Sequence, residues 1–313
     1  MSKPFKTIDE QIELLKSRGL KIVSIHRFKI YLQKYNYHNF INGYNDAFMI
    51  NFDRSSNKYI TGVESSNIID LFNFDRTLSG YLLTNLQNIE RQLSSALTYI
   101  LGQELKQQNV LCCTLLNFHN YHYQKIFKIK NDNELNELYN NMTKLVYRRD
   151  DKLYNSYFDK KNKTYKFCEI PIWSLSLSWC FGDLLYIFSL LTDNIKYKII
   201  RFFTKLNFDI DTFTKTLNML KTLRNRVAHN NVIFNYKYTK NLKAIKRFMV
   251  KNNINFNKST NINIGNIVNI IDKFLPSNSQ LSDIVNKTLK KKIENNKDFL
   301  KESKDYIKFE FFQ

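Results

Sequence analysis

Residues 78–100, LSGYLLTNLQNIERQLSSALTYI, determine the architecture of this chain. They lie within a helical signal that runs from about residue 67 to residue 107. Apolar residues recur in it every three or four positions: Leu78, Leu82, Leu86, Ile89, Leu93, Leu97 and Ile100. This spacing predicts one long helix with a single buried face. The whole chain has only 7 Gly and 3 Pro in 313 residues, which favours long helices over a many-stranded sheet.

Shorter helical signals flank the long one on both sides. Residues 7–10 form a capping box that begins an amphipathic helix, and Gly19 ends that helix. A second helix over residues 25–34 would complete an N-terminal helical hairpin. Residues 171–191 are the most apolar part of the chain and predict a helix at the centre of a bundle, beginning at a proline. Residues 194–206 predict one more amphipathic helix.

A further helix is expected over roughly residues 211–228, with Asp211 as its N-cap. Its apolar stripe contains Phe213, Leu217, Leu220, Leu223 and Val227. Arg224 falls inside this stripe, where a guanidinium is costly unless it is paired or faces a polar cleft. Two interpretations remain open. Arg224 extends from the core edge to solvent or to a carboxylate, or it binds an anion in a cleft.

The anion-binding interpretation involves His229. In an unbroken helix the side chains of Arg224 and His229 would point about 140° apart, too far to share one phosphate. The helix must therefore end or bend near Ala228, and residues 230–231, both asparagine, are a suitable stop signal. After such a break the guanidinium, the Asn225 amide and the imidazole can converge on one phosphate group.

Arg224, Asn225 and His229 resemble the Arg-polar-three-residue-His motif of HEPN ribonucleases. From about residue 5 to about residue 236 the chain also resembles, in order, the Abi-like family of bacterial abortive-infection proteins (AbiD/AbiF type). The segments that carry this resemblance are residues 10–20, 36–44, 75–76, 89–91, 171–173 and 181–182. The resemblance implies an all-α fold: a HEPN-like helical bundle with an N-terminal helical hairpin and a basic C-terminal helical appendage.

The same resemblance implies metal-independent cleavage of RNA, with no cofactor. His229 would act as general base on the ribose 2′-hydroxyl or as acid for the leaving 5′-oxygen, and Arg224 would stabilise charge on the phosphorane. Asn225 would orient His229 or the phosphate. The products would be a 2′,3′-cyclic phosphate and a 5′-hydroxyl. The resemblance further implies a homodimer in which two motifs face each other, restrained by or bound to a small structured RNA.

Glu90 and Arg91 lie beside the buried stripe of the long helix and are candidate supporting residues. A carboxylate near Arg224 would hold its guanidinium in place and would also compete with a phosphate for it. The spacing is equally consistent with both side chains facing solvent.

The charge of the chain favours a polyanionic partner. It has 48 basic and 28 acidic residues, a net charge of +20, which makes RNA binding salt-dependent. No run of about 18 apolar residues, lipidation motif or secretory signal points to a membrane. The four cysteines include no C-x-x-C pair, so we expect a reducing cytoplasm. The basic residues expected to contact RNA are Arg226, Lys160, Lys161, Lys290, Lys291 and Lys292. A solvated lysine surface remains the alternative.

Three regions are expected: residues 1–65, an N-terminal helical and aromatic subdomain; 66–235, the HEPN-like bundle; and 236–313, a basic helical region with few core positions before 267–271. In the first region, Tyr35, Tyr37, Phe40 and Tyr44 either stack on bases or pack a small core. Three functions stay open: an endoribonuclease of phage defence, a non-catalytic RNA-binding module, and a partner of a nucleotidyltransferase. The chain lacks the glycine-rich phosphate loop that would make it the transferase itself.

Overall fold

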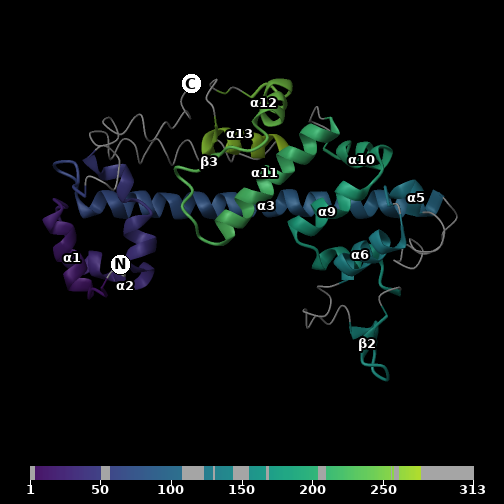
Figure 1. Cartoon of the computed structure of the whole chain (residues 1–313), viewed down its shortest axis with the longest axis horizontal. Helices are drawn as coiled ribbons and strands as arrows, with labels where there is room; N and C mark the ends of the chain where they lie inside the picture. The colour runs from purple at the N-terminus through teal and green to yellow at the C-terminus, as the bar shows by residue number, and fades with distance from the viewer. Residues whose placement is uncertain are drawn as a thin grey trace.

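A computed structural model describes residues 4–50, 57–107, 123–129, 131–143, 155–166, 169–203, 209–254, 256 and 261–275. The fold is all-α, as predicted, with two short two-stranded antiparallel sheets (Figure 1). None of the helices in these ranges is long and apolar enough to cross a membrane.

The long helix α3 (Ser65–Gln107) runs horizontally through the molecule, and the other elements are arranged around it (Figure 1). At 43 residues it is about 65 Å long. Every residue of the predicted stripe, from Leu78 to Ile100, is buried. The structure thus confirms this helix, which begins two residues earlier than predicted.

Two helices and two short helical turns form the N-terminal end of the molecule: α1 (Ile8–Ser17), α2 (Ile25–Tyr37), η1 (His38–Asn42) and η2 (Asn45–Phe48). The capping box is confirmed. The Thr7 backbone N–H donates to Glu10 Oε2 at 2.7 Å, and the Glu10 N–H donates to Thr7 Oγ1 at 3.3 Å. Gly19, at φ +95°, lets the chain turn after α1. These elements lie at one end of α3 (Figure 1).

The aromatic residues of this region pack against α3. Phe40 and Tyr44 are buried, and their rings lie 5.3 and 5.4 Å from that of Phe72 on α3. Tyr35 and Tyr37 are partly buried against the same core. Because the rings of Phe40 and Tyr44 are covered, these two residues serve packing and not base stacking.

The apolar segment 171–191 forms separate short helices instead of one central helix: α8 (Ile172–Leu175), η8 (Ser176–Ser178) and α9 (Phe181–Leu190). Trp179 and Cys180 between them are extended. The break has a local cause, because the Asp183 carboxylate accepts the Cys180 backbone N–H at 3.0 Å and caps α9.

This break corrects the expectation that the whole segment is a helix at the centre of the bundle. Trp173 and Leu177 are 55% and 57% exposed rather than central. Cys180 is exposed at the N-cap of α9. Hydrophobicity alone did not reveal the cap that divides the segment.

At the other end of α3 lie α5 (Tyr123–Ile126), α6 (Asp132–Thr143) and a hairpin of β1 (Phe158–Asp159) and β2 (Thr164–Tyr165) (Figure 1). The predicted helix over residues 194–206 is α10 (Asp193–Ile200). The hairpin projects away from the bundle and carries Lys160 and Lys161 in its turn.

The helix that carries the predicted motif, α11 (Ile210–Ala228), crosses α3 obliquely and packs on it (Figure 1). It is followed by β3 (Lys237–Tyr238), α12 (Leu242–Lys251), β4 (Ile262–Asn263) and α13 (Ile264–Phe274). In α12, Ile245, Phe248 and Met249 are buried against the bundle. The expectation of few core positions before residues 267–271 was therefore wrong, because lysines alternating with these residues obscured an apolar helical stripe.

Candidate active site

The first turn of α11 is capped by Asp209 and not, as predicted, by Asp211. Asp209 Oδ1 accepts the Thr212 backbone N–H at 2.8 Å, and Asp209 Oδ2 accepts the Thr212 hydroxyl at 2.9 Å. Asp211 lies inside the first turn and pairs with Lys215 at 2.7 Å. Partial burial raises the pKa of Asp209, but its hydrogen bonds outweigh that effect and hold the pKa below its ordinary value.

The last turn of α11 breaks where predicted. The helix ends at Ala228, His229 is its C-cap, and Asn230 adopts a left-handed conformation at φ +55°. The Asn230 N–H donates to the Val227 carbonyl at 3.0 Å and the Asn231 N–H to the Arg226 carbonyl at 3.1 Å. This pair of bonds is a Schellman motif, with asparagine in the position that glycine usually occupies.

Arg224 lies at the core edge and faces Glu90 of α3. Its Nε is 3.3 Å from Glu90 Oε2, and the two side chains are 27% and 13% exposed. The geometry is that of an ion pair without a hydrogen bond, since the buried Nε–H makes no hydrogen bond within the described residues. Glu90 therefore pairs with Arg224 instead of facing solvent, and the neighbouring Arg91 is exposed.

Asn225 and His229 are both exposed, one turn apart on α11. The Asn225 side-chain carbonyl accepts Arg224 Nη1 at 3.4 Å, and its backbone carbonyl accepts the His229 N–H at 3.1 Å. Among the described residues no hydrogen bond joins the Arg224 and His229 side chains. The three predicted catalytic residues are thus neighbours at one end of α11, and their joint binding of a phosphate stays a prediction.

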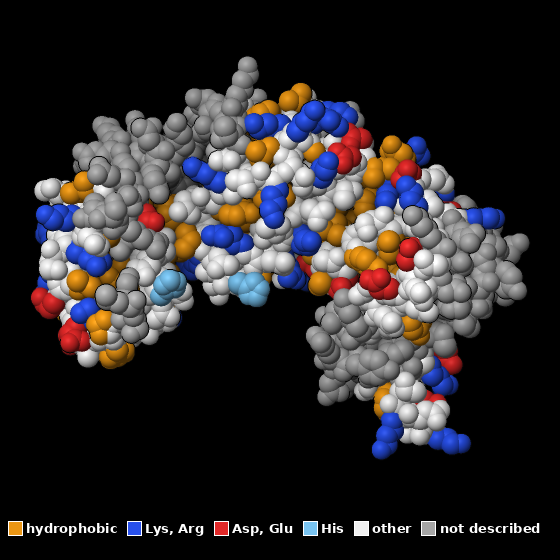
Figure 2. All heavy atoms as spheres, viewed as in Figure 1, with side chains coloured by type: hydrophobic (Ala, Val, Ile, Leu, Met, Phe, Trp, Pro, Cys, Tyr) orange, Lys and Arg blue, Asp and Glu red, His pale blue; other side chains and the backbone are white. Residues whose placement is uncertain are grey.

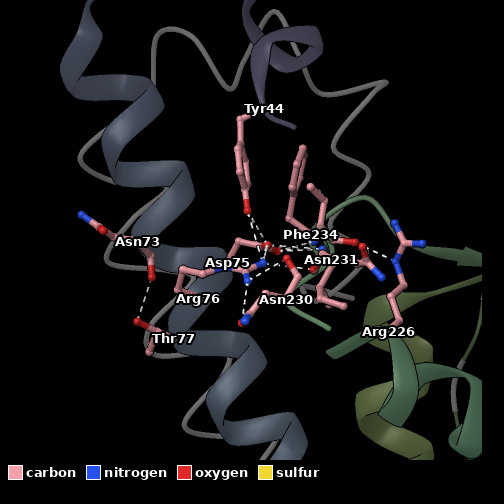
Figure 3. A network of polar contacts seen from close by, with 11 residues as sticks. Tyr44, Asn73, Asp75, Arg76, Thr77, Arg226, Asn230, Asn231 and Phe234 are labelled. Carbon is pink, nitrogen blue, oxygen red and sulfur yellow. Dashed lines mark hydrogen bonds and ion pairs between the residues drawn. The ribbon is translucent and has the colours of Figure 1, made fainter. Parts of the chain in front are cut away.

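Sequence reasoning missed a buried network that holds the segment after His229 (Figure 3). At its centre is the fully buried Asp75 of α3. Its carboxylate accepts the Tyr44 hydroxyl at 2.7 Å and the backbone N–H groups of Ile233 and Phe234 at 3.0 and 2.6 Å. Burial, and then the Asp75 charge, raise the pKa of Tyr44 far above its ordinary value, so its hydroxyl remains a donor.

Arg76 completes this network from the next position of α3. Its Nη1 donates to the Asn230 carbonyl and its Nη2 to the Asn231 carbonyl, both at 3.0 Å. Nη2 also lies 2.8 Å from Asp75 Oδ2. Burial lowers the pKa of Arg76, but its bonds to Asp75 and Tyr44 outweigh that effect and raise the pKa overall. The two residues directly after His229 are therefore held by α3 (Figure 3).

One sequence signal could have revealed the network. Asp75 precedes Leu78 by three positions and Leu82 by seven, which places its carboxylate on the buried stripe of α3. A carboxylate on such a face requires hydrogen-bond partners. The pattern did not show that those partners would be backbone groups 158 and 159 residues away.

The residues predicted to contact RNA have different surroundings. Arg226 Nε donates to the Val232 carbonyl at 2.8 Å, and its guanidinium lies over the Tyr236 ring at 5.1 Å, so Arg226 braces the segment after α11. Lys160 and Lys161 are exposed in the β1–β2 turn, well away from α11 (Figure 1). Lys290, Lys291 and Lys292 lie outside the described residues.

The chemistry available at the end of α11 is that of a cation, an amide and an imidazole. In the described part of the chain, no group of three or more His, Cys, Asp and Glu is placed to hold a metal ion. A guanidinium binds phosphate oxygens through a planar array of donors, and an imidazole exchanges protons near neutral pH. The arrangement suits a reaction at a phosphodiester.

A comparison with known families agrees with the sequence resemblance. Residues 30–235 match the family model described as Abi-like protein, which is well over half of the 313-residue chain. The matched range contains both the Asp75 network and the Arg224–His229 motif. No curated protein and no solved structure matches the chain. On the strength of the family match, the chain belongs to the Abi-like protein family.

Proposed function

We propose that this protein is a metal-independent endoribonuclease of abortive infection, a form of phage defence, with Arg224, Asn225 and His229 as its catalytic residues. Membership of the Abi-like family supports the role in abortive infection. The observation that carries the enzymatic part is the end of α11 at Ala228. It leaves His229 exposed at the C-cap, on the same helix end as a partly exposed Arg224.

In the proposed reaction, the His229 imidazole removes the proton of a ribose 2′-hydroxyl, and the 2′-oxygen attacks the adjacent phosphorus. The bond from phosphorus to the 5′-oxygen then breaks, and that oxygen takes up a proton. The strand ends are a 2′,3′-cyclic phosphate and a 5′-hydroxyl. Arg224 stabilises the negative charge that builds up on the phosphorane. Alternatively, His229 is the acid that protonates the leaving oxygen.

Glu90 has two opposing effects in this proposal. It holds the Arg224 guanidinium in position from α3, which reduces the conformational entropy lost when a phosphate binds. It also neutralises part of the charge that the phosphate would meet. A phosphate of incoming RNA must therefore share the Arg224 guanidinium with Glu90 or displace Glu90 from it.

The proposed active form is a homodimer. One chain supplies one Arg–His motif, and two copies related by a two-fold axis would place two motifs across one strand. A small structured RNA held on the basic surface would restrain the enzyme in the absence of infection.

The Glu90–Arg224 pair also favours a second candidate function. Because a carboxylate already compensates the guanidinium, the protein would bind RNA at this site without stabilising a transition state. This candidate is a non-catalytic RNA-binding module with the same fold.

His229→Gln is the decisive variant, because glutamine keeps a polar side chain but cannot exchange a proton near neutral pH. The RNA that copurifies with the protein expressed from its native locus is isolated. Purified wild-type and variant proteins are incubated with this RNA, and the chemistry of the new strand ends is determined. We expect cleavage to fall by about 10²–10⁴-fold while RNA affinity stays within about twofold.

Thr222→Ala is the matched control. Thr222 is exposed about two turns earlier on α11, and its hydroxyl donates to the Asn218 carbonyl. Equal cleavage by wild type and His229→Gln would remove the catalytic role of His229. Wild-type binding without cleavage would establish the RNA-binding module instead.

A further inference from the structure

The positive charge of the chain is concentrated in one uninterrupted stretch. Residues 212–271 contain no Asp or Glu. Their eleven cations are Lys215, Lys221, Arg224, Arg226, Lys237, Lys240, Lys243, Lys246, Arg247, Lys251 and Lys258. More than half of the net charge of +20 therefore comes from the helix of the candidate site and the elements that follow it.

Within this stretch, α12 separates its apolar and basic residues onto two faces. Ile245, Phe248 and Met249 face the core. The exposed cations form what we call the basic ridge: Lys237, Lys240, Lys243, Arg247 and Lys251. The last three are four positions apart, so they follow one outer face of α12 at about 6 Å per step. Figure 2 shows Lys and Arg side chains gathered at the top of the molecule, over α12.

Most other surface lysines that make ion pairs have a carboxylate of their own. Lys16 pairs with Glu13 at 2.8 Å, Lys21 with Glu64 at 2.7 Å, and Lys128 with Asp193 at 2.7 Å. Such pairs leave little net charge to attract an external anion.

The basic ridge is compensated much less. Arg247 and Lys251 share one carboxylate, that of Asp209, at 3.8 and 3.3 Å. Asp209 is also occupied in capping α11 through Thr212. In the part of the chain that the structure describes, Lys237, Lys240 and Lys243 make no ion pair. The five cations of the ridge thus have one carboxylate, that of Asp209, among their ion pairs in the described residues, and the local field attracts polyanions.

We propose that the basic ridge binds the phosphate backbone of RNA and holds the strand on which the His229 site acts; this inference rests on the proposed function. Residues 230–236 join the ridge directly to His229 in the chain, and the Asp75 network holds them to α3. Both parts are therefore anchored to the same bundle.

The chemistry of the ridge indicates contacts that do not depend on sequence. Lysine ammonium groups act as point charges on phosphates and do not distinguish bases. Tyr238, the aromatic residue of β3, is buried, so it offers no ring on which a base could stack. The ridge therefore contributes affinity and register, while cleavage specificity depends on the residues around His229.

The test uses the full-length protein with Lys237→Gln, Lys240→Gln and Lys243→Gln combined. These three lysines make no ion pair in the described part of the structure, so their replacement leaves Asp209 and the α11 cap intact. Binding of a labelled single-stranded RNA is measured between about 50 and 200 mM salt. We expect the slope of log K against log salt to become shallower by about 2, since each phosphate contact on a single strand contributes roughly 0.7.

A second variant provides the matched control: Lys34→Gln, Lys106→Gln and Lys125→Gln, which removes the same charge from three exposed lysines outside the ridge that make no ion pair among the described residues. We expect it to bind RNA with the wild-type slope. Urea unfolding midpoints equal to wild type show that both variants are folded.

The outcomes separate this inference from the proposed function. An unchanged slope in the ridge variant overturns the inference, and so does a shallower slope in the control variant alone, because it places the contact outside the ridge. In both cases the proposed function stands if the wild-type protein cleaves RNA and His229→Gln does not. Vesicles containing an anionic phospholipid are the second probe. Binding to them that depends on the ridge, with no binding to RNA, overturns the assignment to RNA.

Discussion

Two polar clusters on α3 lie against the segment around the end of α11, and they differ in how their groups are used. The Asp75 cluster is buried, and both carboxylate oxygens accept hydrogen bonds from Tyr44 or from backbone groups. The cluster of Glu90 and Arg224 is partly exposed, and its contact is an ion pair without a hydrogen bond.

This difference indicates which role each cluster is suited to. A buried carboxylate that satisfies several donors is difficult to displace, because removing it leaves those donors without partners. The Asp75 cluster therefore holds residues 230–234 in one arrangement. A partly exposed guanidinium with unused hydrogen-bonding capacity can accept a new anion. Arg224 can therefore exchange Glu90 for a phosphate, as a site that binds a phosphate must.

The most severe test of this comparison is Asp75→Ala. The variant leaves the Tyr44 hydroxyl and two backbone N–H groups without their acceptor and removes the carboxylate that pairs with Arg76. We therefore expect a loss of about 3–5 kcal/mol in the free energy of unfolding. Urea denaturation at constant m-value measures the loss. His229→Ala is the control, expected within about 0.5 kcal/mol of wild type because the side chain is exposed. Equal stability losses in the two variants would contradict the distinction.

Arg224→Ala tests the cluster of Glu90 and Arg224 through the rate of RNA cleavage. Because Arg224 is proposed to stabilise the phosphorane, we expect the single-turnover cleavage rate to fall by about 10²–10³-fold. Arg27→Ala, which removes an exposed arginine of α2, is the matched control and should change the rate by less than about twofold. If both variants cleave RNA at the wild-type rate, Arg224 has no catalytic role.

Glu90→Gln keeps the shape of the side chain and removes its charge. Because Glu90 both positions Arg224 and competes for it, we expect RNA affinity to rise while the cleavage rate falls. Each should change by roughly tenfold, which lies between the effects of an exposed and of a buried ion pair. Equilibrium binding and single-turnover cleavage are measured on the same RNA. A fall in both quantities would show that Glu90 supports RNA binding and does not compete with it.

Tyr44→Phe should have the smallest effect. The ring remains packed against Phe72 and Phe234, and only the hydroxyl that donates to Asp75 is lost. We expect the free energy of unfolding to fall by about 0.5–1.5 kcal/mol. Tyr35→Phe, at a ring that also packs on Phe72, is the control and should stay within about 0.5 kcal/mol. No difference between the two variants would mean that the Tyr44 hydroxyl adds nothing to the cluster.

The helices could be predicted from the sequence where the cause is local. The stripe of α3 depends on residues three or four positions apart, and the capping box of α1 on residues three apart. The end of α11 likewise follows from the consecutive residues Asn230 and Asn231, which close a Schellman motif. The prediction of a single helix over residues 171–191 was wrong, because Asp183 caps α9 at Cys180 inside an otherwise apolar run.

The candidate site could be predicted only in part. The motif of Arg224, Asn225 and His229 is contiguous, so the sequence identifies its members. The pairing of Arg224 with Glu90 joins two helices, and the spacing of either helix left it undecided. The support of residues 230–234 by Asp75 and Arg76 was missed altogether, although the position of Asp75 on the buried stripe indicated that it needed partners.

By itself the sequence determined the helices, the break after Ala228 and the motif, because helical periodicity and capping depend on neighbours within one or two turns. Only the tertiary structure decided which carboxylate faces Arg224 and which backbone groups satisfy Asp75. It also decided that Trp173 is exposed while Tyr44 is buried. These outcomes depend on contacts between residues far apart in the chain, and a pattern of polar and apolar residues does not specify the partner of a buried charge.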